Sequence, residues 1–430
     1  MRISKDIVTI SIVGAGSRAT GYINALEKYY SGKFKVVAVA DPVKSKRDYF
    51  QKIYDIKEDN LFENYQEFNK QDRLSDVVII GTLDDIHYEP AVSALEKGYD
   101  IILEKPISMS LEESVAIGNL AEKYPDQMVA VCHVLRHSPM FRKIKEIIDS
   151  KELGEVVDIQ HNENIGYYHF AHSYVRGNWR NTDISAPISV AKTCHDFDIL
   201  LYLLGNDVHC TSLSSMGDLK FFNHKHFDET KMAKKCADCK VEKDCPYSAI
   251  KIYTAKMIRS VVFDDSTTES LINNLNDSGY GRCVFACDNN VPDHQVTIME
   301  FDNGVHATFN MSAFTKEISR TLKVMFEYGE LRAREKPKSL EITRFGGETQ
   351  IIELPETTGG HNGADEGFVQ NFMESYLYGK PFDSSISASI ESHVMAFAAE
   401  DSRVEKGKLI DIKSYWDDKK VVANKLLKGE

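Results

Sequence analysis

The stretch Ile7-Val8-Thr9-Ile10-Ser11-Ile12-Val13-Gly14-Ala15-Gly16-Ser17-Arg18-Ala19 decides the fold of the N-terminal part of the chain. Residues 7–13 are an apolar run with β-branched side chains, which is typical of a buried strand. The glycine turn follows at once, and residues 20–30 have a pattern compatible with a helix. The order strand, tight turn and helix predicts the opening of a βαβ unit.

The same alternation continues over the next hundred residues. Further strands are expected at 34–40, 77–81, 101–103 and 128–132, with helices that include 90–97 and 111–124. Strands that alternate with helices at this spacing form parallel βαβ units with right-handed crossovers. We therefore expect a doubly wound Rossmann sheet that ends near residue 135.

Beyond this point the strand patterns become longer and alternate between apolar and polar residues. The expected strands are 156–163, 294–301, 305–311 and 321–327. Asp302-Asn303-Gly304 lies between two of them and is a hairpin signal, because glycine supplies the positive φ that such a turn requires. This pattern predicts an α+β domain with a large, mostly antiparallel open sheet.

Three regions follow from these patterns. We expect a Rossmann domain at 1–135 and an α+β domain at 136–385. A Cys-rich excursion interrupts the second domain at about 206–290, and residues 386–430 are expected to form a helical segment that packs back on the chain.

Composition and charge narrow the class of protein. The 430 residues are 42% hydrophobic and 27% charged, which is the ordinary range of a globular protein. Sixty-five acidic and 52 basic side chains give a formal charge of −13, which repels nucleic acid and anionic lipid surfaces. No window has the length and apolarity of a membrane span, and the N-terminal residues lack a signal-peptide pattern. We expect a cytoplasmic protein whose partners include neither nucleic acid nor membranes.

The glycine turn, Gly14-x-Gly16-x-x-Ala19, is a variant of the dinucleotide-binding fingerprint. The first glycine permits the tight turn, the second lets a pyrophosphate approach the backbone, and a small third residue allows close packing of helix on strand. Ser17 and Arg18 then open the helix whose N-terminus faces the phosphates. Asp41, after the second strand, would accept hydrogen bonds from the adenosine ribose and repel a 2′-phosphate, so we expect NAD as cofactor in preference to NADP.

Two further segments carry candidate chemistry. Glu104-Lys105-Pro106 follows the strand at 101–103, at the edge where open α/β sheets bind ligands. Downstream, Lys192-Thr193-Cys194-His195-Asp196-Phe197-Asp198 opens a strongly apolar helix. Lys105 and His195 are candidates for a proton-transfer pair whose pKa values are set by burial and neighbouring charge. The alternative for His195 is a helix-capping or core histidine.

The combination of these motifs resembles the glucose-fructose oxidoreductase / inositol dehydrogenase family, usually written Gfo/Idh/MocA. The resemblance runs from Ile7 to about Ala399, and its most specific element is the Glu-Lys-Pro motif. It rests on the glycine turn, Asp41, Gly81-Thr82 with His87, Glu104-Lys105-Pro106 and the segment from His195 to Asp198.

The resemblance implies roles for individual residues. The family's lysine contacts substrate and nicotinamide while its histidine moves the hydroxyl proton, which implies catalytic roles for Lys105 and His195. Thr82, His87 and Glu104 are implied to lie beside the cofactor. Many members place an aspartate four residues before the histidine, where this chain has Ala191; the next residue, Lys192, is expected to replace part of its function.

Substrate contacts are expected from two polar stretches. Tyr174 to Asn181 contains Arg176, Trp179 and Arg180; amides and charged groups bind sugars while an aromatic ring packs on their C–H surface. The flexible stretch 359–365 supplies His361. Asp198 completes the set of expected substrate-binding residues. An exposed loop is the alternative for the first stretch.

The Cys-rich excursion contains Cys236-x2-Cys239-x5-Cys245. Two cysteines with two residues between them form a chelate loop, and a third within reach makes a tetrahedral thiolate site. Cys283 and Cys287 are candidates for the fourth ligand, and Cys283 is preferred because Gly281 precedes it. Structural zinc is the leading interpretation. An iron–sulfur cluster, suggested by Pro246 after Cys245, and free buried thiols are the alternatives.

These observations predict an NAD-dependent oxidoreductase that acts on a secondary hydroxyl of a sugar, cyclitol or derivative. Two alternatives remain open: an NAD-dependent glycosidase that works through transient oxidation and elimination, and a non-catalytic NAD-binding regulatory protein. We expect a homo-oligomer, either a dimer or a tetramer.

Overall fold

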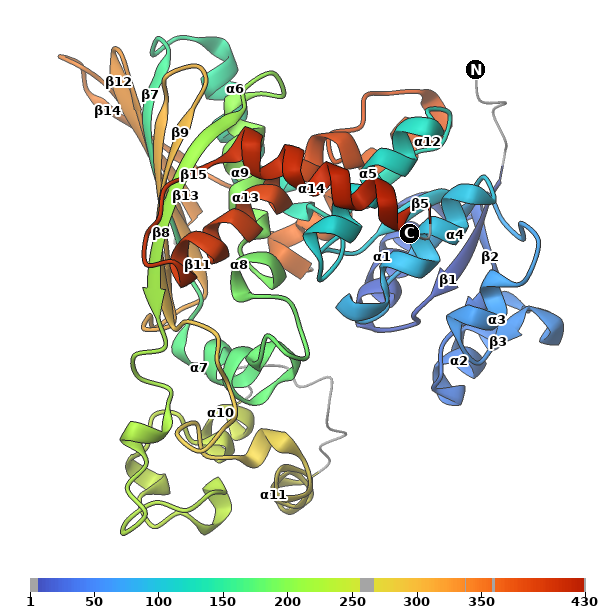
Figure 1. The fold of residues 1–430 in the computed structure, drawn as a ribbon, viewed down its shortest axis with the longest axis horizontal. Helices are drawn as coiled ribbons and strands as arrows, with labels where there is room; N and C mark the ends of the chain where they lie inside the picture. The colour runs from blue at the N-terminus through green and yellow to red at the C-terminus, as the bar shows by residue number, and fades with distance from the viewer. Residues whose placement is uncertain (1–6, 256–266, 337, 358–359, 429–430) are drawn as a thin grey trace.

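Two β-sheets organise the chain (Figure 1). The structure is a computed structural model that describes residues 7–255, 267–336, 338–357 and 360–428. The first sheet has six strands in the order β3-β2-β1-β4-β5-β6, and the second has nine in the order β14-β13-β12-β11-β7-β10-β9-β8-β15. The predicted fold class, a Rossmann sheet joined to a mostly antiparallel sheet, is confirmed.

All strand pairs of the first sheet are parallel. The chain places β2 on one side of β1 and β4 on the other, so the strand order reverses beside β1, which is where such sheets bind ligands. The strands are β1 (Val8–Val13), β2 (Phe34–Ala40), β3 (Leu61–Phe62), β4 (Val77–Ile80), β5 (Asp100–Leu103) and β6 (Val129–Val131). The helices between them are α1 (Ser17–Tyr30), α2 (Lys44–Tyr54), α3 (Tyr65–Asn69), α4 (Tyr88–Glu96) and α5 (Leu111–Lys123).

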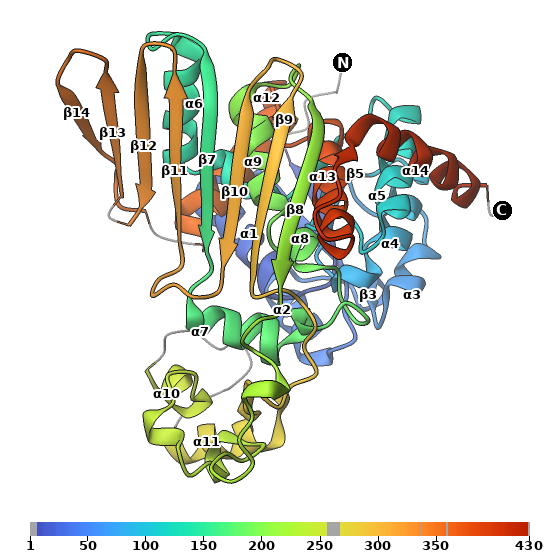
Figure 2. The ribbon, with the colours of Figure 1, turned by 60° about the vertical axis from the view of Figure 1, so that its left-hand side comes forward.

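In the second sheet β7 pairs with β10 in parallel, and the other pairs are antiparallel. Residues along β9 and β10 alternate between buried and exposed, because one face packs on helices and the other is open (Figure 2). The strands are β7 (Val156–Asn164), β8 (Cys210–Asp218), β9 (His294–Phe301), β10 (His306–Ser312), β11 (Ser319–Phe326), β12 (Gly329–Glu335), β13 (Lys338–Arg344), β14 (Thr349–Glu353) and β15 (Ile410–Asp411).

Some of the remaining helices cover the inner face of this sheet or lie at its lower end, and others pack on helices of the Rossmann half. Figure 1 shows α9 and α13 against the sheet, and α10 and α11 below it with α7. Their bounds are α6 (Pro139–Ser150), α7 (Tyr167–Phe170), α8 (Ile188–Ala191), α9 (Cys194–Leu204), α10 (Ala249–Thr254), α11 (Thr268–Asp277), α12 (Ala364–Tyr378), α13 (Ile386–Val404) and α14 (Ile412–Leu426). None of the helices in the described part of the chain combines the length and apolarity needed to cross a bilayer.

The structure differs from the predicted regions in two places. β8 lies inside the expected excursion at 206–290 but is a full strand of the sheet, so the chain leaves the sheet between residues 219 and 293. Its small polar residues hid the alternation that marks a strand. Helix α12, assigned to the second domain, packs against α1, and Phe368 and Phe372 belong to the core beneath the Rossmann sheet.

Candidate active site

The glycine turn between β1 and α1 is built for close approach of a ligand. Gly14 has φ +88°, and a Cβ there would lie 2.5 Å from the Thr82 nitrogen, so other residues are excluded. A Cβ at Gly16 would meet only the Gly81 oxygen, at 3.9 Å. Helix α1 begins at Ser17 without a side-chain cap, which leaves the N–H groups of its first turn available to an anion. These residues fit the pyrophosphate of a dinucleotide.

Asp41 lies directly after β2, beside this turn. It is 4% exposed, and its Oδ2 accepts a hydrogen bond from the Ala15 nitrogen at 2.9 Å. Its Oδ1 accepts one from the Val43 nitrogen at 2.8 Å, and Lys46 Nζ is 3.4 Å from Oδ2. An ionised carboxylate has about four acceptor positions, so capacity remains for ribose hydroxyls. The Lys46 ammonium partly offsets the negative charge that a 2′-phosphate would meet.

Arg18 joins the glycine turn to two carboxylates. Its Nε donates to Glu104 Oε1 at 2.7 Å, and its Nη1 donates to Asp365 Oδ2 at 2.8 Å. Tyr22 also donates to Glu104. Burial raises the pKa of Glu104, but the charge of Arg18 and the Tyr22 hydroxyl outweigh it and lower the pKa overall. Ala19 is buried and packs toward Gly81, which holds α1 close to β4.

Lys105 follows β5 at the carboxyl edge of the sheet, and the peptide bond to Pro106 is cis. Its Nζ donates to the Ala191 oxygen at 2.7 Å, which links the two domains. His87 is 1% exposed; its Nδ1 is 2.7 Å from the Pro106 oxygen, and its Nε2 is 3.4 Å from the Thr82 oxygen. His87 therefore braces the Glu-Lys-Pro turn through Nδ1, while Nε2 faces the loop after β4.

His195 lies in the first turn of α9 and is 3% exposed. Neither of its ring nitrogens has a hydrogen-bond partner among the residues that the structure describes. Burial, followed by the charge of Lys105, lowers the pKa of His195 well below its usual value, so the ring is neutral at pH 7. A neutral imidazole with both nitrogens unengaged can accept a proton from a bound ligand.

Two further buried histidines lie behind His195, and the sequence analysis did not single them out. The His133 ring is 5.5 Å from the His195 ring and 5.2 Å from the His393 ring. His393 Nε2 accepts a hydrogen bond from the Ile107 nitrogen at 3.0 Å, just after the cis bond. Burial lowers the pKa of His393 to about 3. The signal for His133 was its position after β6, at the carboxyl edge of a parallel sheet.

Lys192 takes part in a buried network of charges. Its Nζ is 2.8 Å from Glu163 Oε1, and Arg320 lies 2.8 Å from Glu163 Oε2. Arg320 also pairs with Asp196 at 2.8 Å, and Asp196 accepts from His161 at 2.8 Å. This network was not predicted from the sequence, although polar residues on the inward face of β7 were a visible signal.

Two of the residues expected to bind substrate, Arg176 and Arg180, contact the Cys-rich excursion instead. Arg176 is 2% exposed and donates to the backbone oxygens of Tyr247 and Arg282, each at 2.7 Å. Arg180 forms a bidentate pair with Asp288 at 2.7 and 3.0 Å. Because both guanidinium groups are engaged there, the structure does not join them to Lys105 and His195.

Asp198 and Trp179 also make specific protein contacts. Asp198 is fully buried, and both its oxygens accept from Arg136 at 2.7 Å, so it positions the start of α9 and does not reach a ligand. Trp179 Nε1 donates to Asp84 Oδ2 at 2.8 Å. This bond places the half-buried indole beside the loop after β4, on the cofactor side of the site.

His361 does approach His195. Its Nδ1 is 2.9 Å from Asp365 Oδ1, and its ring lies 5.8 Å from the His195 ring. The His361 side chain is 35% exposed, so the site has a route to solvent at this ring. Gly359, the first residue of the expected polar stretch, lies outside the described residues.

The four cysteines predicted to bind zinc line one cavity of about 470 Å³, whereas Cys287 does not. Burial raises the pKa of Cys283 to about 11. Within the described ranges, however, no three histidine, cysteine, aspartate or glutamate side chains are grouped closely enough to hold a metal ion. The expectation of a closed tetrahedral zinc site is therefore not supported. Zinc requires all its ligands about 2 Å from a single ion.

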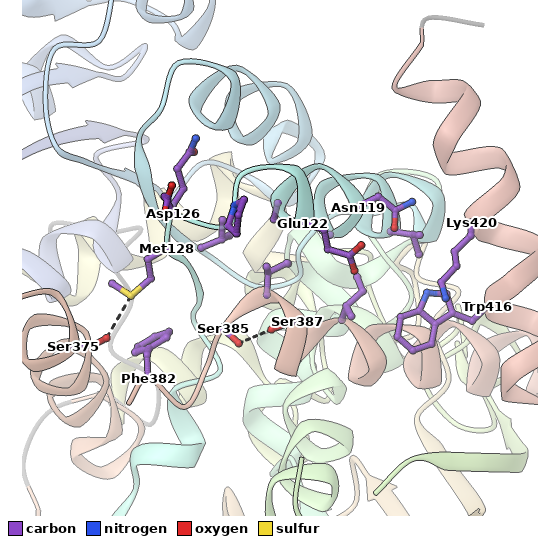
Figure 3. Close-up of a pocket in the computed structure, with 18 of the residues that line it drawn as sticks. Asn119, Glu122, Asp126, Met128, Ser375, Phe382, Ser385, Ser387, Trp416 and Lys420 are labelled. Carbon is purple, nitrogen blue, oxygen red and sulfur yellow. Dashed lines mark hydrogen bonds between the residues drawn. The ribbon is translucent and has the colours of Figure 1, made fainter. Parts of the chain in front are cut away.

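A cavity of about 940 Å³ lies elsewhere, between β6, α5 and the C-terminal helices. Figure 3 shows Trp416 and Lys420 at one end and Phe382 with Ser375 at the other. None of the residues with expected catalytic or cofactor roles lines it. The candidate active site is therefore the surroundings of Lys105 and His195, where ionisable groups converge.

Comparison with known proteins gives two family matches that together span most of the chain. Residues 8–133 match the oxidoreductase family, NAD-binding Rossmann fold, of Gfo/Idh/MocA, and residues 145–409 match its C-terminal alpha/beta domain. Bacillus subtilis (strain 168) YteT, whose name assigns it provisionally to the oxidoreductases, is 24% identical over 83% of this chain and 86% of its own length. The NAD(+) scyllo-inositol 2-dehydrogenase of the same organism is 31% identical over 43% of this chain and 49% of its own length.

Solved structures show the same fold. An inositol dehydrogenase homologue from Azotobacter vinelandii, complexed with NADH and myo-inositol, has a TM-score of 0.65 at 15% identity, over 94% of this chain and 98% of its own. A levoglucosan dehydrogenase complexed with NADH has a TM-score of 0.68 at 14% identity, over 94% of this chain and 99% of its own. At these identities the likeness establishes the fold.

Proposed function

Because this chain belongs to the Gfo/Idh/MocA oxidoreductase family, we propose that it oxidises a secondary hydroxyl of a sugar, cyclitol or derivative, with NAD as the oxidant. The observation that carries the proposal is the pair at the domain junction: a buried His195, without a hydrogen-bond partner among the described residues, in the electrostatic field of Lys105. The names of the inositol and levoglucosan dehydrogenases support the substrate class.

The N-terminal domain holds the cofactor in this proposal. The turn from Gly14 to Ala19 binds the pyrophosphate, Asp41 binds the ribose, and Thr82 borders the cofactor with a buried hydroxyl that lacks a described partner. When bound, NAD supplies the acceptor for the hydride that leaves the substrate carbon. Glu104 holds Arg18 and the turn in place.

Lys105 and His195 act on the substrate hydroxyl. The Lys105 ammonium donates a hydrogen bond to the hydroxyl oxygen and stabilises the negative charge that develops as the O–H bond breaks. A ring nitrogen of His195 accepts the proton. His361 carries it toward solvent, because its ring is the exposed neighbour of His195. The products are a ketone, a reduced cofactor and one proton.

Lys192 and Trp179 are the proposed contacts with the rest of the substrate. Lys192 is 13% exposed and held by Glu163, so it presents a fixed ammonium to ligand hydroxyls. The Trp179 indole offers an apolar face to sugar C–H groups. Arg176, Arg180 and Asp198 have no place in this contact set, because other protein groups engage them.

The test mixes the protein and NAD with a panel of sugars, cyclitols and aryl glycosides while NADH and released aglycone are recorded. Net NADH with a free sugar or cyclitol supports the proposal. Aglycone release without net NADH would instead identify the glycosidase. Binding of NAD without turnover on any member of a broad panel would favour the regulatory protein.

Self-association is proposed through the open face of the second sheet. Met216 and Val296 are register partners on β8 and β9, and Ile298 lies on the same face; their exposed fractions are 62%, 44% and 56%. Such an apolar patch is typical of an interface. Light scattering should give a dimer or larger, and Val296→Lys should shift it toward the monomer. A monomeric unmutated protein would contradict this proposal.

A further inference from the structure

Two stretches of the Cys-rich segment that are far apart in sequence meet at one point. Lys235 and Arg282 form an isolated β-bridge, and the Cys283 nitrogen donates to the Lys234 oxygen at 2.8 Å. Cys236 follows Lys235 directly. The backbone therefore brings Cys236 and Cys283 to the same place although 46 residues separate them.

The other two cysteines reach this place through consecutive turns. The Cys239 nitrogen donates to the Cys236 oxygen at 3.2 Å, and the Cys245 nitrogen donates to the Glu242 oxygen at 3.1 Å. All four cysteines line the same cavity of about 470 Å³. The apolar part of the lining comes from Phe221, Met232, Val241, Pro246 and Phe285.

A buried cation also borders this cavity. Arg176 Nη2 is 3.7 Å from Cys236 Sγ, and Nη1 has no hydrogen-bond partner among the described residues. The Ala249 nitrogen donates to the same sulfur at 3.4 Å. An unpaired donor on a buried guanidinium is costly unless a ligand engages it. N–H groups that point at cysteine sulfur are what thiolate-bound metal centres use to stabilise their charge.

The four cysteines do not form a site for a single metal ion among the described residues. Tetrahedral zinc places its sulfurs about 4 Å apart, given the ~2.3 Å Zn–S bond, and no described group of three ligands meets such a requirement. A polynuclear cluster instead distributes four thiolates over several irons, so its cysteines need not converge on one ion. We propose that Cys236, Cys239, Cys245 and Cys283 ligate one iron–sulfur cluster in this cavity.

To test this, the full chain is purified without oxygen, and its content of iron, zinc and acid-labile sulfide is measured. We expect iron and sulfide in about equal amounts and broad visible absorbance that bleaches on reduction. If the cluster is lost during purification, ferric and ferrous iron with sulfide should restore it, with absorbance that saturates at one cluster per chain. Stoichiometric zinc without sulfide, or metal-free protein that fails to take up iron and sulfide, would overturn the proposal.

Two matched variants locate the ligands. Cys239→Ser should lose most of the iron and sulfide. Cys287→Ser should retain both, because Cys287 is buried in the same segment but does not line the cavity. Circular dichroism of each variant shows whether it is folded. Equal iron retention by the two folded variants would overturn the assignment.

The variant Arg176→Gln tests the proposal through the reduction potential, a property that a group of cysteines with only a structural role would not have. Removing a buried positive charge beside a cluster disfavours the added electron, so the reduction potential should become more negative. An unchanged reduction potential would show that the Arg176 charge does not act on the cluster. These measurements need neither NAD nor substrate, so their failure leaves the proposed dehydrogenase activity intact, and the reverse also holds.

Discussion

Lys105 Nζ donates a hydrogen bond to the main-chain oxygen of Ala191 at 2.7 Å. The contact joins the end of the fifth Rossmann strand to the last residue of α8, at the position where the resemblance leads one to expect an aspartate. A backbone oxygen does not titrate, so it orients the Lys105 side chain without adding a charge. The chain therefore positions its lysine through the main chain where a carboxylate is absent.

The first prediction concerns Lys105. Lys105→Met should lower kcat by about a hundred-fold or more, because the developing alkoxide loses its donor. NADH affinity, followed by fluorescence, should stay close to that of the unmutated protein. Lys143→Ala is the control, since Lys143 pairs only with exposed Glu146 at the surface. Near-normal kcat in Lys105→Met would remove the lysine from the mechanism.

The second prediction concerns the pH dependence of turnover. Burial and the charge of Lys105 hold the pKa of His195 well below its usual value, so its base form persists as the pH falls. The acid limb of kcat/KM should therefore lie below about 6.5, the ordinary histidine value. In His195→Asn that limb should disappear and the rate should drop. If the acid limb of kcat/KM persists in His195→Asn, it belongs to another titrating group and the prediction is wrong.

The third prediction concerns cofactor choice. Asp41→Ala should weaken the preference for NAD over NADP several-fold, because the carboxylate no longer repels a 2′-phosphate. Lys46→Ala should strengthen the preference, since Lys46 Nζ lies 3.4 Å from Asp41 Oδ2 and partly offsets its charge. The ratio of kcat/KM for the two cofactors is the measurement. Tighter use of NADP by the unmutated protein would contradict the assignment.

The fourth prediction concerns stability and pH. Burial lowers the pKa of His169 to about 3, of His172 to about 4 and of His393 to about 3, so the unfolded chain binds more protons below about pH 6.5. Stability should be highest above that pH and fall as the pH drops toward these folded values. Urea midpoints from pH 7 to 5 test this. His393→Gln should lessen the pH dependence by about one proton; an unchanged dependence would contradict it.

The fifth prediction separates a structural from a substrate role for Asp198. Asp198→Ala strands the buried Arg136 guanidinium and should lower the free energy of unfolding by about 3–5 kcal/mol. Asp48→Ala, which removes an exposed partner of Lys44, should cost about 0.5 kcal/mol or less. Urea denaturation measures both. A stable Asp198→Ala protein with a raised KM would restore the substrate role.

Much of the Rossmann half could be predicted because its signals are local. The glycine turn and the apolar runs that became β1, β2 and β4 each lie within a dozen residues, and the parallel order follows from the helices between them. β8 escaped because Ser212, Ser214 and Ser215 interrupt its apolar alternation. The strand is recognised from its backbone pairing with β9 in the structure, which the sequence pattern does not show.

Part of the candidate site could also be predicted from the sequence, because some of its residues lie in local motifs. Lys105 and His195 stand in motifs, whereas His133, in the loop after β6, contacts His195, and His393 of α13 contacts His133. The sequence of an arginine-rich loop does not show whether its guanidinium groups contact a sugar or other parts of the same protein. Arg176 binds carbonyls about 70 and 106 residues away, and no local pattern carries that information.

The measurement that tests the central claim most directly is the stoichiometry of a complete reaction. The unmutated protein is incubated with excess NAD and the best free sugar or cyclitol of the panel, and NADH and ketone are quantified together. The account predicts one NADH and one ketone for each substrate consumed, and neither product with Lys105→Met. Substrate consumed without NADH, or equal product formation by Lys105→Met, would contradict it.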